Sequence, residues 1–382
     1  MDALTITADL VRFESTSSLT NVPIIDYCEA LLKRRGFEIE RLDYTDEKGI
    51  RKSNVVGKKG TGTGGMAYFG HTDVVPADPW FFTGHGPFQP TEKDGKLFGR
   101  GSCDMKGSVA CAIAAADRFS KGELKKPIYI TLTADEEVGY HGAKEVANRS
   151  ELFKEMIAGN ANGIIGEPTE LEVVYAHKGT YGIVVSSKGK AAHSSTKEGL
   201  NANLAMIPFL AEMKTIHDET KSDPAWLNEE FDPPWISWNI GINDYTYAVN
   251  ITPPQSICTV YFRPMPGQDP DKLLARAEEA AKRCGVEFKT RSRGKPLYVD
   301  PKSPFVQEVL KVSGKETART VAYGTDGAML TDLKNMLVLG PGSIRQAHTH
   351  DEFIALEQLE KGTDLYAKLM RHWCCYTSRG NE

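Results

Sequence analysis

The sequence MAYFGHTDVVP at residues 66–76 starts as an apolar run and then reaches an imidazole and a carboxylate, His71 and Asp73. A second apolar run, at residues 128–133, is likewise followed by carboxylates, at residues 135–137. Short apolar runs bounded by glycine and polar residues are typical of strands buried on both faces of a sheet. Between the two runs, residues 106–119 are rich in alanine and predict a helix. This alternation of strand and helix predicts an α/β fold with a largely buried sheet.

Length and composition exclude several classes of protein. Of 382 residues, 40% are apolar and 25% are charged, which is ordinary for a globular protein of two or three domains. The formal net charge of −5, without a block of like charge, argues against nucleic-acid binding. No apolar run approaches the roughly 18–20 residues of a membrane helix, and the first residues lack the features of a signal peptide. The seven cysteines show no Cys-x-x-Cys spacing. We therefore expect a cytoplasmic protein that binds neither nucleic acid nor membranes.

The pattern changes in the middle of the chain. Residues 180–292 predict the order β-α-β-β-α-β, with strands at 180–188, 235–242, 256–263 and 286–292 and helices at 200–216 and 271–283. This order is the ferredoxin-like arrangement, which is complete in itself. The α/β pattern then resumes up to the C-terminal helix near 355–373. We therefore expect a discontinuous domain of residues 1–179 and 293–382, with residues 180–292 inserted as a second domain.

Five clusters of carboxylate and imidazole side chains lie mostly where predicted strands end. In an open α/β sheet the carboxyl ends of the strands form the crevice that binds ligands. Each cluster alone also has an ordinary explanation, such as a packed histidine, a helix-capping aspartate or solvated glutamates. Three adjacent carboxylates at one strand end repel one another, however, and a bound cation relieves that repulsion. The set therefore indicates a metal centre, with candidates at His71, Asp104, residues 135–137, Glu167 and residues 348–352.

Four of these motifs together resemble a known family. GHTDVVP (70–76), GRGSCDMKG (99–107), DEEVG (135–139) and GEPT (166–169) occur in the order seen in the M20 family of zinc-dependent amidohydrolases and peptidases. That family includes acetylornithine deacetylases, succinyl-diaminopimelate desuccinylases, aminoacylases and carboxypeptidases. The resemblance covers nearly the whole chain. It implies a zinc-peptidase-like catalytic domain, with a mixed sheet flanked by helices, and an inserted ferredoxin-like α+β domain that acts as lid and dimerisation domain.

The resemblance also implies a di-zinc centre, although Co²⁺ or Mn²⁺ also suit such nitrogen and oxygen donors. One metal would be held by His71 and Glu167 and the other by Glu137 and His348, with Asp104 bridging both. A cis peptide is implied at Asp104-Met105. Glu136 would be the general base that takes a proton from water. Asp73 would accept the second N–H of the His71 ring and so fix its tautomer.

Further roles are implied outside the metal centre. His193 would reach the active site of the partner subunit in a homodimer and stabilise the oxyanion. Asn250 and Arg263 would grip the substrate carboxylate, and Thr325 would contact substrate. Taken alone, His193 also suits a turn cap, Arg263 an edge-strand surface charge, and Thr325 a plain turn. For the last metal ligand, the pattern His-x-x-Asp-Glu favours His348 over His350.

The implied reaction is hydrolysis of an N-acyl amide on an amino acid. HKG (177–179) and AAHSS (191–195) resemble acetylornithine deacetylases, whereas residues 80–90 also resemble desuccinylases. A dipeptidase or carboxypeptidase would use the same metals and base, and an inactive binding protein could keep the same fold. GTGTGG (60–65) matches a dinucleotide motif but precedes a strand, so we interpret it as a hairpin loop.

Overall fold

The structure is a computed structural model that describes residues 1–376. The chain forms two compact units. Unit 1 contains Met1–Ala176, Tyr298–Arg319 and residues 325–376, and unit 2 contains His177–Leu297 and Thr320–Gly324. Within residues 1–376, no helix has the length and apolarity needed to cross a membrane.

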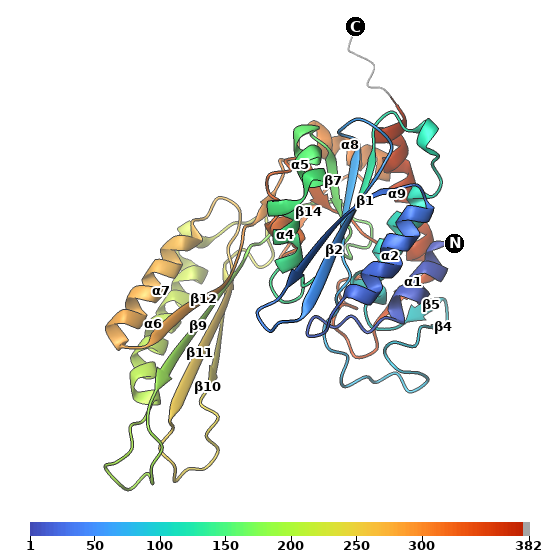
Figure 1. The fold of residues 1–382 in the computed structure, drawn as a ribbon. Helices are drawn as coiled ribbons and strands as arrows, with labels where there is room; N and C mark the ends of the chain where they lie inside the picture. The colour runs from blue at the N-terminus through green and yellow to red at the C-terminus, as the bar shows by residue number, and fades with distance from the viewer. Residues whose placement is uncertain (377–382) are drawn as a thin grey trace. The chain divides into compact units, whose positions relative to one another are not determined.

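Unit 1 is built on a mixed sheet (Figure 1). Its strand order is β1-β2-β6-β3-β7-β15-β8-β13, and β14 pairs with β8. The neighbours β6, β3, β7 and β15 are parallel, whereas β1 and β2 are antiparallel to each other, as are β2 and β6. The strands are β1 (Glu38–Thr45), β2 (Arg51–Lys59), β3 (Met66–His71), β6 (Ile128–Thr133), β7 (Asn162–Ile165), β8 (Val174–His177), β13 (Leu297–Tyr298), β14 (Arg319–Val321) and β15 (Met336–Val338).

The centre of this sheet confirms the α/β prediction, and its edge shows what the sequence pattern missed. Every residue of β3 and β6 is buried, as their continuous apolar runs predict. The edge strand β1 was not predicted because it is rich in charged residues and largely accessible to solvent. The hairpin prediction for residues 60–65 is wrong. This loop joins β2 to β3, and those strands are not neighbours because β6 lies between them.

The helices of unit 1 include a tightly packed group. α1, α3 and α9 contact one another, and every residue of α3 is buried. Small side chains permit this close approach, since a Cβ added at Gly362 of α9 would lie 3.4 Å from the sulfur of Cys111 in α3. The helices are α1 (Ala3–Val11), α2 (Val22–Arg34), α3 (Gly107–Ala116), α4 (His141–Arg149), α5 (Glu151–Ala158), α8 (Pro304–Ser313) and α9 (Leu356–Met370).

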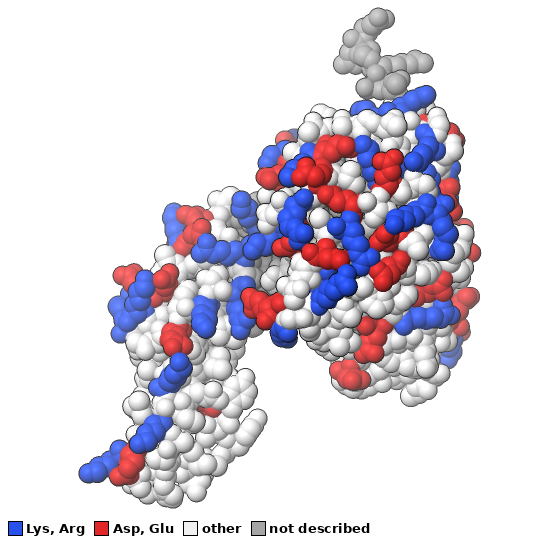
Figure 2. All heavy atoms as spheres, viewed as in Figure 1, with Lys and Arg blue, Asp and Glu red and all other residues white. Residues whose placement is uncertain are grey.

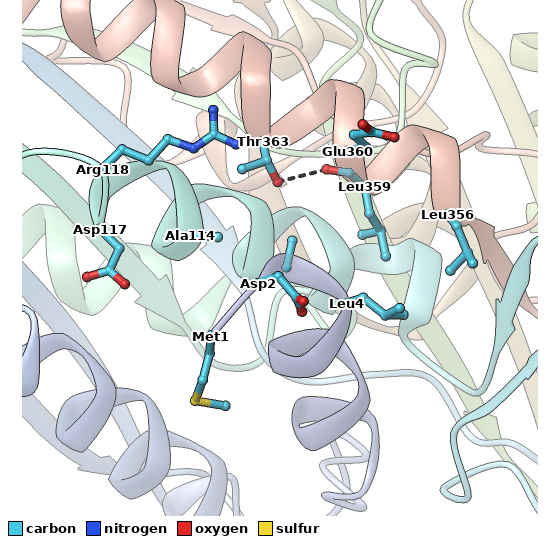
Figure 3. Close-up of a pocket in the computed structure, with 11 residues that line it drawn as sticks. Met1, Asp2, Leu4, Ala114, Asp117, Arg118, Leu356, Leu359, Glu360 and Thr363 are labelled. Atoms are coloured by element: carbon cyan, nitrogen blue, oxygen red, sulfur yellow. Dashed lines mark hydrogen bonds between the residues drawn. The ribbon is translucent and has the colours of Figure 1, made fainter.

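A hollow of about 510 Å³ lies beside this helix group, at the start of α1 and against α3 and α9 (Figure 3). Met1, Asp117, Arg118 and Glu360 are among its lining residues. None of the residues lining it is a candidate site residue, so this hollow is not the site that the sequence motifs predict.

A smaller antiparallel sheet of unit 1 joins distant parts of the chain. Its strand order is β16-β5-β4, with β4 (Thr91–Lys93), β5 (Lys96–Phe98) and β16 (Phe353–Ala355). β16 follows directly after the motif at residues 348–352, and β5 directly precedes the motif at residues 99–107. The pairing of these two strands therefore brings the two motifs together.

Unit 2 has the predicted ferredoxin-like fold. Its antiparallel sheet has the order β10-β11-β9-β12, and α6 and α7 lie together on one face of it (Figure 1). Along β11, buried and more accessible residues alternate, as expected of a sheet covered on one face only. The elements are β9 (Thr180–Lys188), α6 (Asn203–Ser222), β10 (Ser237–Asn243), β11 (Gln255–Arg263), α7 (Pro270–Cys284) and β12 (Glu287–Gly294).

Candidate active site

The parallel strands at the centre of unit 1 bring the candidate metal ligands to one edge of the sheet. His71 is the last residue of β3, Glu136 and Glu137 follow β6, and Glu167 follows β7. Because parallel strands end at the same edge, residues far apart in the sequence meet there. Three groups of side chains have ligand atoms within 4.8 Å of one another: His71 with Asp104 and Glu167, Asp104 with Glu137 and His348, and His71 with Glu136 and Glu137.

His71 is buried and faces two carboxylates. Its Nε2 lies 3.1 Å from Oδ1 of Asp104 and 3.5 Å from Oε1 of Glu167. Burial lowers the pKa of His71, but the carboxylates of Asp104, Glu167 and Glu136 together raise that pKa well above its usual value. The surroundings of Nε2 therefore favour a positive charge, either a proton or a metal ion.

Asp104 connects the two sides of the cluster. It lies in a tight turn, Ser102–Lys106, that precedes α3, and its backbone is not helical, with φ −119° and ψ 95°. The Asp104-Met105 peptide is cis, as the resemblance implies. One carboxylate oxygen faces His71, and the other lies 3.3 Å from Nε2 of His348. This is the placement expected of a shared ligand.

His348 closes the other side of the cluster. Its Nε2 lies 3.1 Å from Glu137, and hydrogen bonds to Asp104 and Glu137 raise the pKa of His348 to about 10. The ring of His350 instead packs against Phe81, with ring centroids 4.7 Å apart. Among the described residues, His348 and not His350 belongs to a group that could hold a metal.

Glu136 is a buried carboxylate beside the candidate ligands. Burial raises its pKa well above the usual value; His71 opposes this effect, and the neighbouring Glu167 and Glu137 add to it. Burial likewise raises the pKa of Glu167 and of Glu137. Concentrated negative charge of this kind is stabilised by a cation.

The donor atoms suit a pair of divalent metal ions. Two of the three groups share Asp104, and each combines one imidazole with two carboxylates. Imidazole and carboxylate donors bind Zn²⁺ and also suit Co²⁺ or Mn²⁺. The residues present therefore fit the metal centre that the sequence motifs predict.

Asp73 differs in detail from the expectation. Nδ1 of His71 donates to the backbone carbonyl of Asp73 at 2.9 Å, whereas the Asp73 carboxylate lies 3.7 Å away. That carboxylate accepts hydrogen bonds from the hydroxyl of Ser17 and from the backbone N–H groups of Glu136 and Glu137. The residue thus orients the His71 ring through its backbone and supports the Glu136–Glu137 turn through its side chain.

The first carboxylate of the Asp135–Glu137 motif does not face the cluster. Asp135 is buried and accepts hydrogen bonds from Lys52 at 2.6 Å and from the hydroxyl of Tyr44 at 2.7 Å. The expectation of three mutually repelling carboxylates is therefore wrong for this residue, because a buried ammonium group neutralises it. Neither Lys52 nor Tyr44 carried a signal in the sequence, since each lies more than 80 positions from Asp135.

Two of the predicted unit 2 residues lie together, and the third lies apart. The loop that carries His193 bridges to Ile251, and the N–H of Ser194 donates to the carbonyl of Asn250. Both His193 and Asn250 are exposed. Arg263 lies at the far end of β11, about 25 Å of extended strand away. There its guanidinium donates to the Thr180 hydroxyl.

Thr325 belongs to unit 1 and is fully buried. Its hydroxyl accepts a hydrogen bond from the N–H of Gly327 and caps the short turn Asp326–Ala328. The neighbouring carboxylate of Asp326 accepts from the hydroxyl of Thr133, the last residue of β6. This places Thr325 in a turn beside the end of β6.

Comparison with known proteins agrees with the geometry. Residues 67–372 match the model of peptidase family M20/M25/M40. The acetylornithine deacetylase of Myxococcus xanthus is 34% identical over 380 residues, covering 96% of each chain, and that of Proteus mirabilis is 34% identical over 378 residues, covering 96% of this chain and 94% of the relative.

Solved structures share the fold at low identity. An M20 family metallo-carboxypeptidase from Sulfolobus solfataricus has a TM-score of 0.77 at 17% identity, with 98% of this chain and 99% of that chain covered. Human carnosine dipeptidase 1 has a TM-score of 0.73 at 17% identity, with 96% of each chain covered. The chain therefore belongs to peptidase family M20/M25/M40 and is a hydrolase that acts on amide bonds.

Proposed function

We propose that this protein hydrolyses the N-acyl amide bond of an acylated amino acid, as an acetylornithine deacetylase does. The observation that carries the proposal is the pair of ligand groups that share Asp104, with the buried Glu136 beside them. The full-length similarity to acetylornithine deacetylases supports this class of substrate.

Each residue of the cluster has a role in the proposed reaction. His71 and Glu167 would hold one zinc ion and Glu137 and His348 the other, with Asp104 shared. The two ions would supply Lewis acidity to the amide carbonyl and acidify a water molecule. Glu136 takes one proton from the attacking water and donates it to the leaving nitrogen, so that the amide yields a carboxylate and an amine. Its burial suits this role, because a raised pKa makes the carboxylate a stronger base.

Paired substitutions test these roles. We expect Glu136→Gln to abolish turnover while the protein still binds about two metal ions per chain. Glu137→Gln should instead lose metal, because Glu137 is one of the proposed ligands and lies beside His348. Metal content measured by mass spectrometry, with turnover of N-acetylornithine, N-succinyl-diaminopimelate, N-acetyl amino acids and dipeptides, separates the two effects. Equal metal loss in both variants would refute the assignment, and preferential turnover of dipeptides would refute the substrate class.

Unit 2 is proposed as a lid and dimerisation domain. Its edge strand β10 and the following loop expose large apolar side chains, with Tyr247 96% and Val249 98% exposed. Charged side chains are sparse on this part of the surface (Figure 2). An unpaired edge strand with an apolar loop is the kind of surface that a second chain covers. We therefore propose a homodimer formed through this surface.

His193 would then act on the partner's active site. His193 and Arg263 lie about 25 Å apart along β11 and so cannot both contact one small substrate within a single copy of unit 2. In a dimer, Arg263 and the partner's His193 can serve the same site. The imidazole of His193 would donate a hydrogen bond to the developing oxyanion, an interaction worth roughly 3 kcal/mol.

Mixed dimers test this arrangement. His193→Ala should lower kcat strongly while metal content and dimer mass stay unchanged. When His193→Ala chains are mixed with Glu136→Ala chains, one site of each heterodimer combines an intact Glu136 with an intact His193, so partial activity should return. Heterodimers that form and bind zinc but remain inactive would refute action across the dimer.

A further inference from the structure

Glu352 is a buried carboxylate whose contacts all lie in the turn that carries Asp104 or just before it. It is 1% exposed and directly precedes β16. One oxygen accepts from the backbone N–H groups of Cys103 and Asp104, each at 2.9 Å. The other accepts from the N–H of Gly101 at 2.8 Å and from the guanidinium of Arg100 at 2.7 Å.

These contacts account for the unusual backbone at Asp104. A turn with φ −119° and ψ 95° at Asp104 does not continue the hydrogen-bond pattern of an ordinary helix. Buried N–H groups without partners are costly, and one carboxylate satisfies three of them here. The carboxylate of Glu352 therefore stabilises the conformation that points Asp104 toward both His71 and His348.

Glu352 also joins this turn to the segment that carries His348. The two residues are four positions apart, and the carbonyl of Glu352 accepts a hydrogen bond from the N–H of Gly99. Pairing of β16 with β5 continues this connection, with Phe353 opposite Phe98. His71 and Glu167, by contrast, are positioned by β3 and β7. Within residues 1–376, the side-chain hydrogen bonds of Glu352 run to residues 100–104.

We propose that Glu352 is a positioning residue for one half of the metal centre. It holds the Asp104 turn and the His348 segment in register, so that the metal position formed by Asp104, Glu137 and His348 depends on it. The position formed by His71, Asp104 and Glu167 depends on it less, because only Asp104 among these three residues lies in that turn. The proposal rests on the proposed function, since it assigns a role within the same metal centre.

The central test is Glu352→Asp, which keeps the negative charge opposite Arg100 but shortens the side chain by one methylene. The shorter side chain cannot reach all of its partners in the turn. Metal-free protein is titrated with Zn²⁺ by calorimetry, and hydrogen exchange of residues 99–106 is measured on the metal-free protein. We expect the Zn²⁺ affinity of the position formed by Asp104, Glu137 and His348 to fall about 10–100-fold and the affinity of the other position to fall less, so that the two binding steps respond unequally.

Two further variants separate positioning from general stability. Leu32→Ala removes a fully buried side chain from α2 and should lower the midpoint of urea unfolding without touching the centre. It should keep both metal affinities. The double variant Arg100→Met/Glu352→Gln is compared with Arg100→Met alone. In the double variant an NH2 group replaces one of the two acceptor oxygens that face the turn, and no guanidinium is left buried without its partner.

The outcomes are distinct. Selective loss of one metal affinity with faster exchange at residues 99–106, in Glu352→Asp or in the double variant, supports the proposal. Wild-type affinities for both ions in folded variants would overturn it and leave the proposed function intact. If Leu32→Ala lost as much Zn²⁺ affinity as the Glu352 variants, or if both Glu352 variants failed to fold, the role of Glu352 would be merely structural and the proposal would be overturned. A wild-type protein that binds no metal would refute the proposed function itself.

Discussion

The buried ion pair beneath Glu136 gives the sharpest stability prediction. Lys52 and Asp135 are 1% and 2% exposed, and their charged atoms lie 2.6 Å apart. Lys52 also donates to the carbonyl of Ser17, and Tyr44 donates to the second oxygen of Asp135. Removal of either charge leaves the other buried without its partner.

The expected magnitudes follow from that burial. Breaking a buried pair by removing one partner costs about 3–5 kcal/mol, whereas replacing both partners by neutral groups costs far less than the sum. We therefore expect Lys52→Met and Asp135→Asn each to lower the free energy of unfolding by about 3–5 kcal/mol. The double variant should be about 2–3 kcal/mol more stable than additivity predicts.

Urea unfolding of the four proteins in a double-mutant cycle measures this coupling. The matched control is the exposed pair of Arg118 and Asp364, whose side chains are 48% and 53% exposed at 2.7 Å. Its coupling should stay below about 1 kcal/mol. If the Lys52 and Asp135 substitutions were additive within about 0.5 kcal/mol, the structural argument for this pair would be wrong.

The pair also bears on activity. Asp135 adopts φ 57°, a left-handed conformation, immediately before the proposed general base. The double variant should fold yet lose activity, because the turn that orients Glu136 loses its two charged supports. Unchanged kcat in the folded double variant would show that the pair serves stability alone.

Three further predictions concern separate parts of the molecule. Burial lowers the pKa of His177 from 6.5 to about 4. The free energy of unfolding should therefore fall by about 3 kcal/mol as the pH drops from 6.5 to 4, because the unfolded chain takes up this proton more readily. His177→Gln should make the free energy of unfolding less dependent on pH in this range, and an unchanged dependence would contradict the argument. Gly166→Ala should reduce the amount of bound metal, measured by mass spectrometry. Gly166 directly precedes Glu167, and a Cβ at this position would lie 2.3 Å from the hydroxyl of Tyr68, so the backbone that carries Glu167 must shift. Full metal content in the variant would contradict this prediction. His348→Ala should weaken Zn²⁺ binding in calorimetry more than His350→Ala does, and the reverse order would invert the ligand assignment.

The parts of the fold that the sequence predicts well share one property: their apolar residues are next to one another or regularly spaced in the sequence, and these same residues are buried in the structure. The apolar runs that end at His71 and before Asp135 mark strands and also mark the edge at which ligands gather. The inserted β-α-β-β-α-β order needs only its own residues to be complete. Amphipathic and apolar periodicity reports such elements directly.

The supporting contacts could not be predicted, because their signal lies in pairs of distant residues. Lys52 lies in a charged stretch of sequence, which is typical of surface residues. Its buried partner, Asp135, is 83 positions away. Glu352 reads as one acid among several, although its partners lie about 250 positions earlier in the chain. Sequence spacing carries no information about contacts of this kind, and a single chain offers no covariation to reveal them.

The distance between Arg100 and Glu352 in the sequence, 252 positions, has a consequence for how the protein is made. A ribosome delivers β3, β6 and β7 long before residues 348–352, and domains generally begin to fold from the N-terminal end during synthesis. Under the proposed roles, an unfinished chain already carries four of the ligands but lacks both His348 and the carboxylate that shapes the Asp104 turn. Under these roles, a product that terminates before residue 348 is inert, and hydrolase activity requires synthesis beyond residue 352.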